Sequence, residues 1–218
     1  MSIAQNILSI KKTLPPHVKL VVVSKTQPVE NIVQAYDAGQ RLFAESRPQV
    51  LLEKAAQLPT TIEWHFIGHL QTNKVKLVVG LAHTIHSVDS ERLAREIEKE
   101  AERKQITQRC LLQIFIAQEE QKFGFSPEEI RALFADNFLS NFPHLQIVGL
   151  MGMATFTDDA EQIRNEFCKL KNLFDELKQK YFSDNPDFCE LSMGMSGDYI
   201  IAIEEGSTMV RIGTSIFA

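Results

Sequence analysis

Residues 19–39 read KLVVVSKTQPVENIVQAYDAG and place a β-type run directly before a helical segment. The first part, KLVVVSK, is rich in β-branched apolar residues, which is typical of a strand buried on both faces. The second part, residues 29–38, follows Pro28, spaces its apolar residues as a helix does and stops at Gly39. A strand followed by a helix is the unit from which parallel sheets are built, so this stretch predicts an α/β fold.

The same unit recurs along the chain. The predicted strands are residues 19–25, 41–45, 64–68, 84–88, 110–117, 146–151, 189–193 and 209–213. The predicted helices are residues 29–38, 48–57, 72–79, 90–104, a segment that begins at Ser126, 158–180 and 197–204. Eight such units without a linker favour a single (β/α)8 TIM barrel over residues 1–218, with an open doubly wound sheet as the alternative. No helix is predicted after the eighth strand, and the amphipathic segment 3–14 is expected to replace it.

The composition excludes several classes of protein. The 218 residues are 44% hydrophobic and 23% charged, which is typical of a globular protein and not of a disordered one. The net charge of −5, without a basic run, argues against nucleic acid as a partner. The N-terminus does not resemble a signal peptide, and no apolar run approaches the roughly 20 residues that span a bilayer. We therefore expect no membrane partner.

The cysteines and histidines do not form a metal site or a disulfide framework. Cys110, Cys168 and Cys189 cannot all pair with one another, and none lies in a C-x-x-C arrangement. His83 and His86 flank the fourth predicted strand without further ligands at a suitable spacing, so we interpret them as structural. Free thiols suit a reducing compartment, and a cytoplasmic protein without a metal is expected.

In a parallel barrel the functional residues lie at the carboxyl ends of the strands. Lys25 ends the first predicted strand, so its amine is expected at the rim of a dry core. Desolvation lowers the pKa of a lysine, and a neutral amine can condense with an aldehyde. The alternative is a surface lysine that closes an ordinary strand.

The third predicted strand ends in WHFIGHLQ, residues 64–71. Alternation sends His65 and Ile67 to one face and Phe66 to the other. His69 lies just past the strand end, where it either contacts a ligand or caps a loop.

The densest signal follows the last two strands, where residues 192–198 read SMGMSGD and residues 211–215 read RIGTS. Small residues with free N–H groups at adjacent strand ends predict an anion cradle, and barrels usually bind phosphate there. Arg211 points into the barrel and needs an acceptor or an anion; an ion pair with Glu190 or Glu45 is the alternative. Pyridoxal 5′-phosphate offers a phosphate, an acceptor for Arg211 and an aldehyde for Lys25.

Five stretches resemble the pyridoxal-phosphate homeostasis protein family, which consists of small single-domain relatives of the alanine racemase N-terminal barrel. They are VVVSKTQPVENI (21–32), WHFIGHLQTNKVK (64–76), KFGF (122–125), GLMGM (149–153) and LSMGMSGDYIIAIEEGSTMVRIGTSIF (191–217). The resemblance implies that Lys25 holds the cofactor as a Schiff base and that Arg211 faces the pyridine nitrogen. It also implies that His69 lies beside the ring and that the phosphate is held by Ser192, Ser196, Gly213 and Thr214.

Two places depart from the family pattern. Ser46 stands where the family usually has an asparagine in F-G-E-N-Y, and its shorter side chain replaces that asparagine only partly. Residues 114–115 are Ile-Phe where V-N is usual. Both departures are expected near the rim of the pocket, so they concern cofactor affinity more than the fold.

The resemblance implies a protein that binds and buffers pyridoxal 5′-phosphate in vitamin B6 homeostasis, without robust catalysis. Apo forms of pyridoxal-phosphate enzymes are candidate partners, and a monomer is expected because no second, racemase-type domain is present. The alternative is a racemase-like enzyme, which needs a second base such as a tyrosine; of Tyr36, Tyr181 and Tyr199, only Tyr199 follows a site loop. An arginine at the pyridine nitrogen also weakens the ring as an electron sink. A barrel enzyme for phosphorylated sugars would need rim carboxylates, for which Glu45 and Asp89 are the candidates.

Overall fold

Eight parallel strands pair in chain order, and the last pairs with the first to close a barrel. The computed structural model describes residues 2–118, 123–136 and 138–218. The strands are β1 (Lys19–Val23), β2 (Leu42–Glu45), β3 (Glu63–Phe66), β4 (Thr84–Val88), β5 (Gln108–Gln113), β6 (Leu145–Met151), β7 (Glu190–Ser192) and β8 (Met209–Ile212). The predicted (β/α)8 barrel is confirmed, and the open sheet is excluded by the pairing of β1 with β8.

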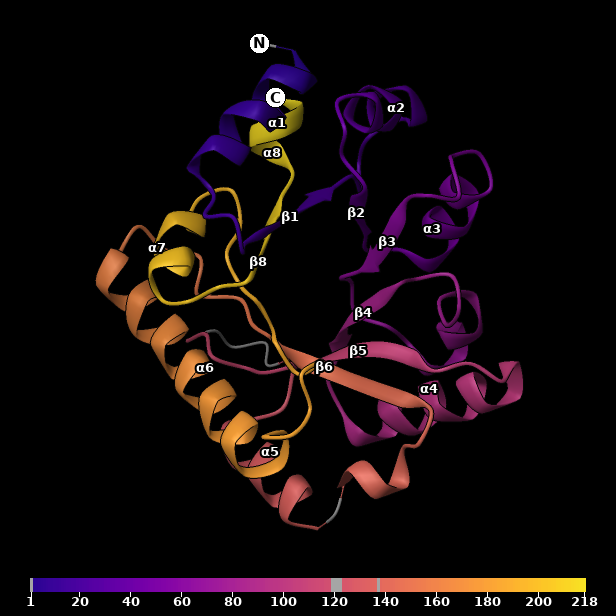
Figure 1. The fold of residues 1–218 in the computed structure, drawn as a ribbon, viewed down its shortest axis with the longest axis vertical. Coiled ribbons are helices and arrows are strands. Elements are labelled where there is room, and N and C mark those ends of the chain that lie inside the picture. The colour runs from indigo at the N-terminus through magenta and orange to yellow at the C-terminus, as the bar shows by residue number, and fades with distance from the viewer. Residues whose placement is uncertain (1, 119–122, 137) are drawn as a thin grey trace.

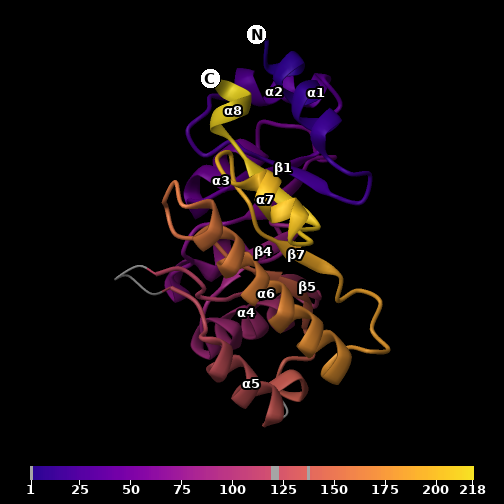
Figure 2. The same cartoon turned by 90° about the vertical axis from the view of Figure 1, so that its left-hand side faces the viewer.

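Helices surround the ring of strands (Figure 1). They are α1 (Ile3–Thr13), α2 (Val29–Asp37), α3 (Pro48–Ala55), α4 (Glu91–Lys104), α5 (Pro127–Ala135), α6 (Ala160–Tyr181), α7 (Tyr199–Glu204) and α8 (Thr214–Phe217), with the 3-10 helices η1 (Thr72–Leu77) and η2 (Phe138–Asn141). Figure 2 shows α6 running along the side of the barrel next to α7. No helix in the described residues is long and apolar enough to cross a membrane.

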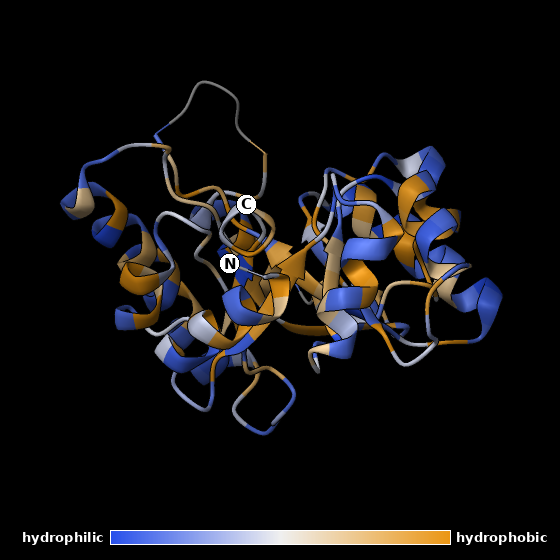
Figure 3. Ribbon diagram, turned by 90° about the horizontal axis from the view of Figure 1, so that it is seen from above, coloured by the Kyte–Doolittle hydropathy of each residue, from blue (hydrophilic) through white to orange (hydrophobic). Residues whose placement is uncertain are grey.

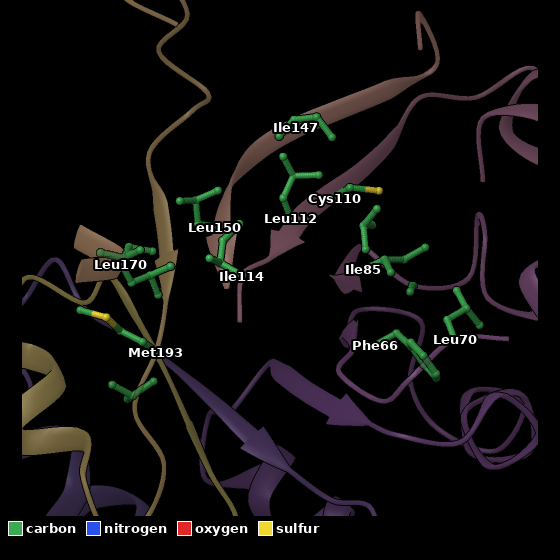
Figure 4. Packing of buried hydrophobic residues seen from close by; sticks show 14 of the residues in the cluster. Phe66, Leu70, Ile85, Cys110, Leu112, Ile114, Ile147, Leu150, Leu170 and Met193 are labelled. Atoms are coloured by element: carbon green, nitrogen blue, oxygen red, sulfur yellow. The ribbon is translucent and has the colours of Figure 1, made fainter. Parts of the chain in front are cut away.

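The main core lies between the strands and the helices. Figure 3 shows the helices with hydrophobic residues toward the strands and hydrophilic residues toward the outside. Phe66, Ile85, Cys110 and Leu112 lie in this layer, as Figure 4 shows. Ile67, by contrast, packs inside the barrel against Val21, Ala44 and Met209, so the predicted alternation of Phe66 and Ile67 is confirmed.

Helices from both ends of the chain cover the barrel beside β8. The chain forms a single-turn helix, α8, directly after β8, where none was predicted. As predicted, α1 covers this part of the barrel: it packs on α8 and α2, and Asn6 Nδ2 donates to the carbonyl of Ile216 at 2.9 Å.

The predicted strand 110–117 is too long, because β5 ends at Gln113. Ile114 instead forms an isolated bridge with Phe125, and the amide of Phe125 donates to the carbonyl of Gln113 at 2.9 Å. Apolar composition continues past the point where the chain leaves the barrel, so it could not mark the strand end. The predicted helix 72–79 is the 3-10 helix η1, and η2 was not predicted.

Gly149 lets β6 and β7 approach each other. Its φ is +154°, and a Cβ at this position would lie 1.7 Å from the carbonyl oxygen of Glu190. The register of β5 against β6 also shifts at this level. The glycine therefore allows the close pairing of β6 with β7 that places Met151 and Gly152 at the carboxyl end of the barrel.

Candidate functional site

A cavity of about 650 Å³ opens at the carboxyl ends of the strands; we call it the upper cavity. Its walls come from the ends of β1, β2, β3, β6, β7 and β8 and the loops that follow them. The residues that line it include Val23, Lys25, Ser46, Ile67, Met151, Met153, residues 154–158, Met195, Ser196, Gly197, Asp198, Arg211, Gly213 and Thr214. Of the predicted site residues, Lys25, Ser196, Arg211, Gly213 and Thr214 are brought together here.

Lys25 lies at the mouth of this cavity. It lines the cavity at its rim, as expected, but it is exposed, so its side chain is not shielded from solvent. The amine makes no hydrogen bond or ion pair with the described residues. The amine is thus available to a ligand. No described side chain holds it, so its position is set by the backbone at residues 24 and 25.

A buried ion pair holds the residue before Lys25. Lys54 Nζ lies 2.6 Å from Glu45 Oε1 and donates to the carbonyl of Ser24 at 2.7 Å. The hydroxyl of Ser24 donates to the same carboxylate oxygen at 2.8 Å. Since Glu45 is fully buried and paired, it is neither the partner of Arg211 nor a rim carboxylate for sugar chemistry.

Arg211 is buried and carries its charge without a carboxylate partner among the described residues. Its Nη1 donates to the carbonyl and to the hydroxyl of Ser192, at 2.8 and 2.7 Å, and Nη2 donates to the carbonyl of Gly152 at 3.1 Å. Glu190, the other suggested partner, pairs with Lys19. Burial lowers the pKa of Arg211 to about 10, and Asp198 opposes this shift. Arg211 therefore stays protonated near neutral pH and lines a cavity that an acceptor can enter.

The loops after β7 and β8 present unused donors. The backbone N–H groups of Ser196, Gly197, Gly213 and Thr214 have no acceptor in the part of the chain that the structure describes. A Cβ at Gly213 would lie 2.9 Å from the carbonyl oxygen of Val23, so glycine allows this loop to pass close to β1. These four N–H groups belong to residues that line the cavity, as the predicted anion cradle requires.

Ser192 is buried behind the cavity and does not line it. Its oxygen lies 2.7 Å from Nη1 of Arg211 and 3.1 Å from Nδ1 of His86. His86 Nε2 in turn lies 2.8 Å from Nδ1 of His65. Ser192 thus positions Arg211. His86 is structural, as interpreted, and it contacts Ser192 directly behind the site.

His69 is not brought into the upper cavity. It is exposed, its Nδ1 lies 2.9 Å from Oδ2 of Asp89, and its ring centroid lies 5.1 Å from that of Phe123. Asp89, the second candidate rim carboxylate, is occupied by this contact. Lys122, the first residue of the KFGF stretch, lies outside the described residues.

Sequence reasoning missed the loop after β6, whose residues 153–158 line one wall. The rule that barrel sites use the carboxyl ends of strands would have pointed to it, but only Met153 belongs to a recognised stretch, GLMGM, and residues 154–158 carry no motif. Ser46 lines the cavity as expected, whereas Ile114 and Phe115 are not among the lining residues.

Comparison with known proteins gives consistent matches over the whole chain. The family model described as alanine racemase, N-terminal domain, matches residues 1–218. The pyridoxal phosphate homeostasis protein of Aquifex aeolicus is 42% identical over 200 residues, which is 91% of this chain and 86% of the relative. That of Homo sapiens is 40% identical over 91% of this chain and 75% of the relative. PipY of Synechococcus elongatus with PLP bound superposes with a TM-score of 0.89, at 36% identity over the full length of both chains. Alanine racemase of Clostridium difficile, at 15% identity and a TM-score of 0.75, shares the fold over 99% of this chain and 55% of its own.

Proposed function

This chain belongs to the pyridoxal phosphate homeostasis protein family, and from that premise we propose that its upper cavity binds pyridoxal 5′-phosphate. The single observation that carries the proposal is the buried guanidinium of Arg211, which has only neutral oxygens as partners in the described chain. An arginine is retained in such a place when a ligand supplies a further acceptor.

The residues of the upper cavity fit the three polar ends of the cofactor. The free N–H groups of Ser196, Gly197, Gly213 and Thr214 suit the phosphate, and Ser196 and Thr214 bring hydroxyl groups to the same cavity. Arg211 would donate to the pyridine nitrogen, and Ser192, which does not line the cavity, would act on the cofactor only through Arg211. The volume of about 650 Å³ lies within the usual range of small-molecule sites.

When bound, the cofactor supplies an aldehyde that a primary amine can attack. Lys25 is the amine at the mouth of the cavity. Lys25 would hold the cofactor through a reversible bond between its nitrogen and that aldehyde, with one molecule of water released. Such a bond holds the cofactor covalently and is reversed by hydrolysis, which suits a protein that stores and releases it.

We infer binding and not turnover as the primary role. All three tyrosines of the chain lie away from the upper cavity: the hydroxyl of Tyr36 contacts Thr61, Tyr181 packs on Phe134, and that of Tyr199 lies 3.3 Å from Thr13 Oγ1. No tyrosine is thus placed as the second base of a racemase. A cationic arginine at the pyridine nitrogen would also keep that nitrogen unprotonated, which disfavours carbanion chemistry.

The wider role belongs to the same proposal. The single domain of residues 1–218 would act as a monomer in the cytoplasm and exchange the cofactor with apo forms of pyridoxal-phosphate enzymes. The three free cysteines suit a reducing compartment. His69 would contact the cofactor only if the loop after β3 turned its ring away from Asp89.

Equilibrium dialysis against pyridoxal 5′-phosphate tests the proposal. We expect saturable binding with a visible absorbance band, and weaker binding in Lys25→Ala and Ser196→Ala. Lys169→Ala, which removes an exposed amine from α6, is the control and should bind like the parent. Absence of saturable binding in the parent, or equal affinity in Lys25→Ala, would overturn the proposal.

A further inference from the structure

A second cavity, of about 450 Å³, opens at the amino ends of the strands, opposite the upper cavity. We call it the lower cavity. It shares no lining residue with the upper one. Its charged lining residues are Lys11, Lys19, Arg41, Arg109, Glu63 and Glu190.

Positive charge is in excess in the lower cavity. Both carboxylates have nearby partners: Glu190 pairs with Lys19, and Glu63 Oε2 lies 3.7 Å from Nε2 of His83. Lys11, Arg41 and Arg109 have no carboxylate within 4.0 Å in the described chain. The nearness of Arg41 contributes to the lowered pKa of Lys11, after the effect of burial. Three cations without counterions therefore border one cavity.

Two buried nitrogens of residues that line this cavity have no partner among the described residues: Nε2 of His65 and Nε of Arg109. His65 is only 2% exposed, and it lines the lower cavity. A buried polar atom without a partner destabilises a fold by roughly 1–3 kcal/mol unless something fills the site.

The hydrogen-bond chain through the barrel places a proton on Nε2 of His65 if the hydroxyl hydrogen of Ser192 is used. Arg211 can only donate, so the hydroxyl of Ser192 accepts from it, and Nδ1 of His86 is the acceptor left for the hydroxyl hydrogen among the described residues. A neutral His86 then carries its proton on Nε2 and donates it to Nδ1 of His65. Burial lowers the pKa of both imidazoles, that of His65 to about 3, so both are neutral near pH 7. His65, which lines the lower cavity, therefore carries an N–H donor that no described residue uses.

We propose that the lower cavity is a second ligand site, which binds the phosphate group of a small phosphorylated molecule. His65 Nε2 and Arg109 Nε donate at its buried end, and Lys11 and Arg41 supply charge around the opening. Three unpaired cations match a dianionic oxyanion better than a monocarboxylate, because arginine pairs well with phosphate oxygens. The volume leaves room for the rest of a small metabolite.

An NMR titration of the full chain with inorganic phosphate tests this site, with sodium chloride at matched ionic strength as the reference. We expect saturable amide shifts at His65, Thr84 and Arg109 that are separate from shifts at Ser196 and Thr214. This separation distinguishes the lower site from the proposed cofactor site, whether or not the cofactor binds. Shifts confined to residues 196–214, or shifts that chloride reproduces, would overturn the proposal.

Two neighbouring lysines on α1 provide a matched pair of variants. Lys11 lines the lower cavity and Lys12 does not. We expect Lys11→Gln to weaken phosphate binding severalfold and Arg109→Gln to weaken it roughly tenfold. Lys12→Gln should match the parent. Equal dissociation constants for the two lysine variants would contradict the assignment, and this comparison stands even if Arg109→Gln folds poorly. Acetate in place of phosphate should bind more weakly; tighter binding of acetate would refute the phosphate preference.

Discussion

The hydroxyl oxygen of Ser192 lies 2.7 Å from Nη1 of Arg211, and the carbonyl of the same serine accepts from that nitrogen at 2.8 Å. Ser192 on β7 thus holds the guanidinium of Arg211 on β8 from the side away from the upper cavity. Because the hydroxyl also contacts His86, the serine joins the proposed cofactor site to the polar interior of the barrel.

Ser192→Ala should separate stability from positioning. The change removes one acceptor of Arg211 and leaves Nδ1 of His86 without its donor, so we expect unfolding in urea to lose about 1–3 kcal/mol. Cofactor affinity should fall severalfold because Arg211 is less firmly held. Ser126→Ala, which removes the N-cap of α5 and does not line the upper cavity, should lose about 1 kcal/mol without a change in affinity. An unchanged affinity in Ser192→Ala would show that Arg211 does not depend on it.

The buried pair of Lys54 and Glu45 offers a second test. Lys54→Met leaves a buried carboxylate uncompensated, and we expect a loss of about 3–5 kcal/mol in the free energy of unfolding. The double variant Lys54→Met/Glu45→Leu should recover most of this loss, because no charge is then left unpaired. Denaturant unfolding of both variants measures the difference. A double variant no more stable than the single one would count against the pair as the cause.

Gly149 and Gly39 form a matched pair for backbone strain. Both have positive φ. A Cβ at Gly149 would lie 1.7 Å from the carbonyl oxygen of Glu190, whereas a Cβ at Gly39 would have no atom within 4 Å. Gly39→Ala should therefore lose only about 1–2 kcal/mol from its left-handed conformation. Gly149→Ala should exceed the ~1–3 kcal/mol typical of overpacking, since a strand backbone must move. Thermal unfolding compares the two, and similar losses would contradict the close approach of β6 and β7.

The two buried imidazoles predict how stability depends on pH. The folded state lowers the pKa of His65 to about 3 and that of His86 well below its usual value, whereas unfolded histidine titrates near pH 6.5. The unfolded chain therefore binds more protons, so stability is present above pH 6.5 and is lost as the pH falls toward 3. Between pH 6 and 5 His65 should remove about 1 kcal/mol, and His86 should act in the same direction. Urea unfolding of His65→Phe should show a shallower slope than the parent, and equal slopes would contradict a neutral, buried His65.

Much of the fold was predictable because each strand is a short, β-rich run followed by a helix signal. The same rule led to Lys25, Ser196, Arg211 and Thr214, since residues at the carboxyl ends of neighbouring strands meet in space. The end of β5 was not predictable, because Ile114 stays apolar and buried after the chain has left the barrel.

The polar interior was also beyond reach of sequence. Lys54 sits on α3 with the spacing of an ordinary charged helix residue, and only the structure shows that it reaches Glu45 on β2. The contact of His86 with Ser192 joins residues 106 positions apart, and no local pattern encodes it. The position of His69 depends on its partner Asp89 after β4, which the residue pattern around the third strand does not reveal.

Borohydride reduction of the protein saturated with pyridoxal 5′-phosphate, followed by peptide mass spectrometry, tests the central claim most directly. Reduction makes a bond between the cofactor and an amine permanent, so the labelled residue can be identified. We predict a single major modification on Lys25 in the parent and in Lys169→Ala, and none in Lys25→Ala. Modification of a different lysine, or label retained in Lys25→Ala, would contradict the assignment of Lys25 and of the upper cavity as the cofactor site.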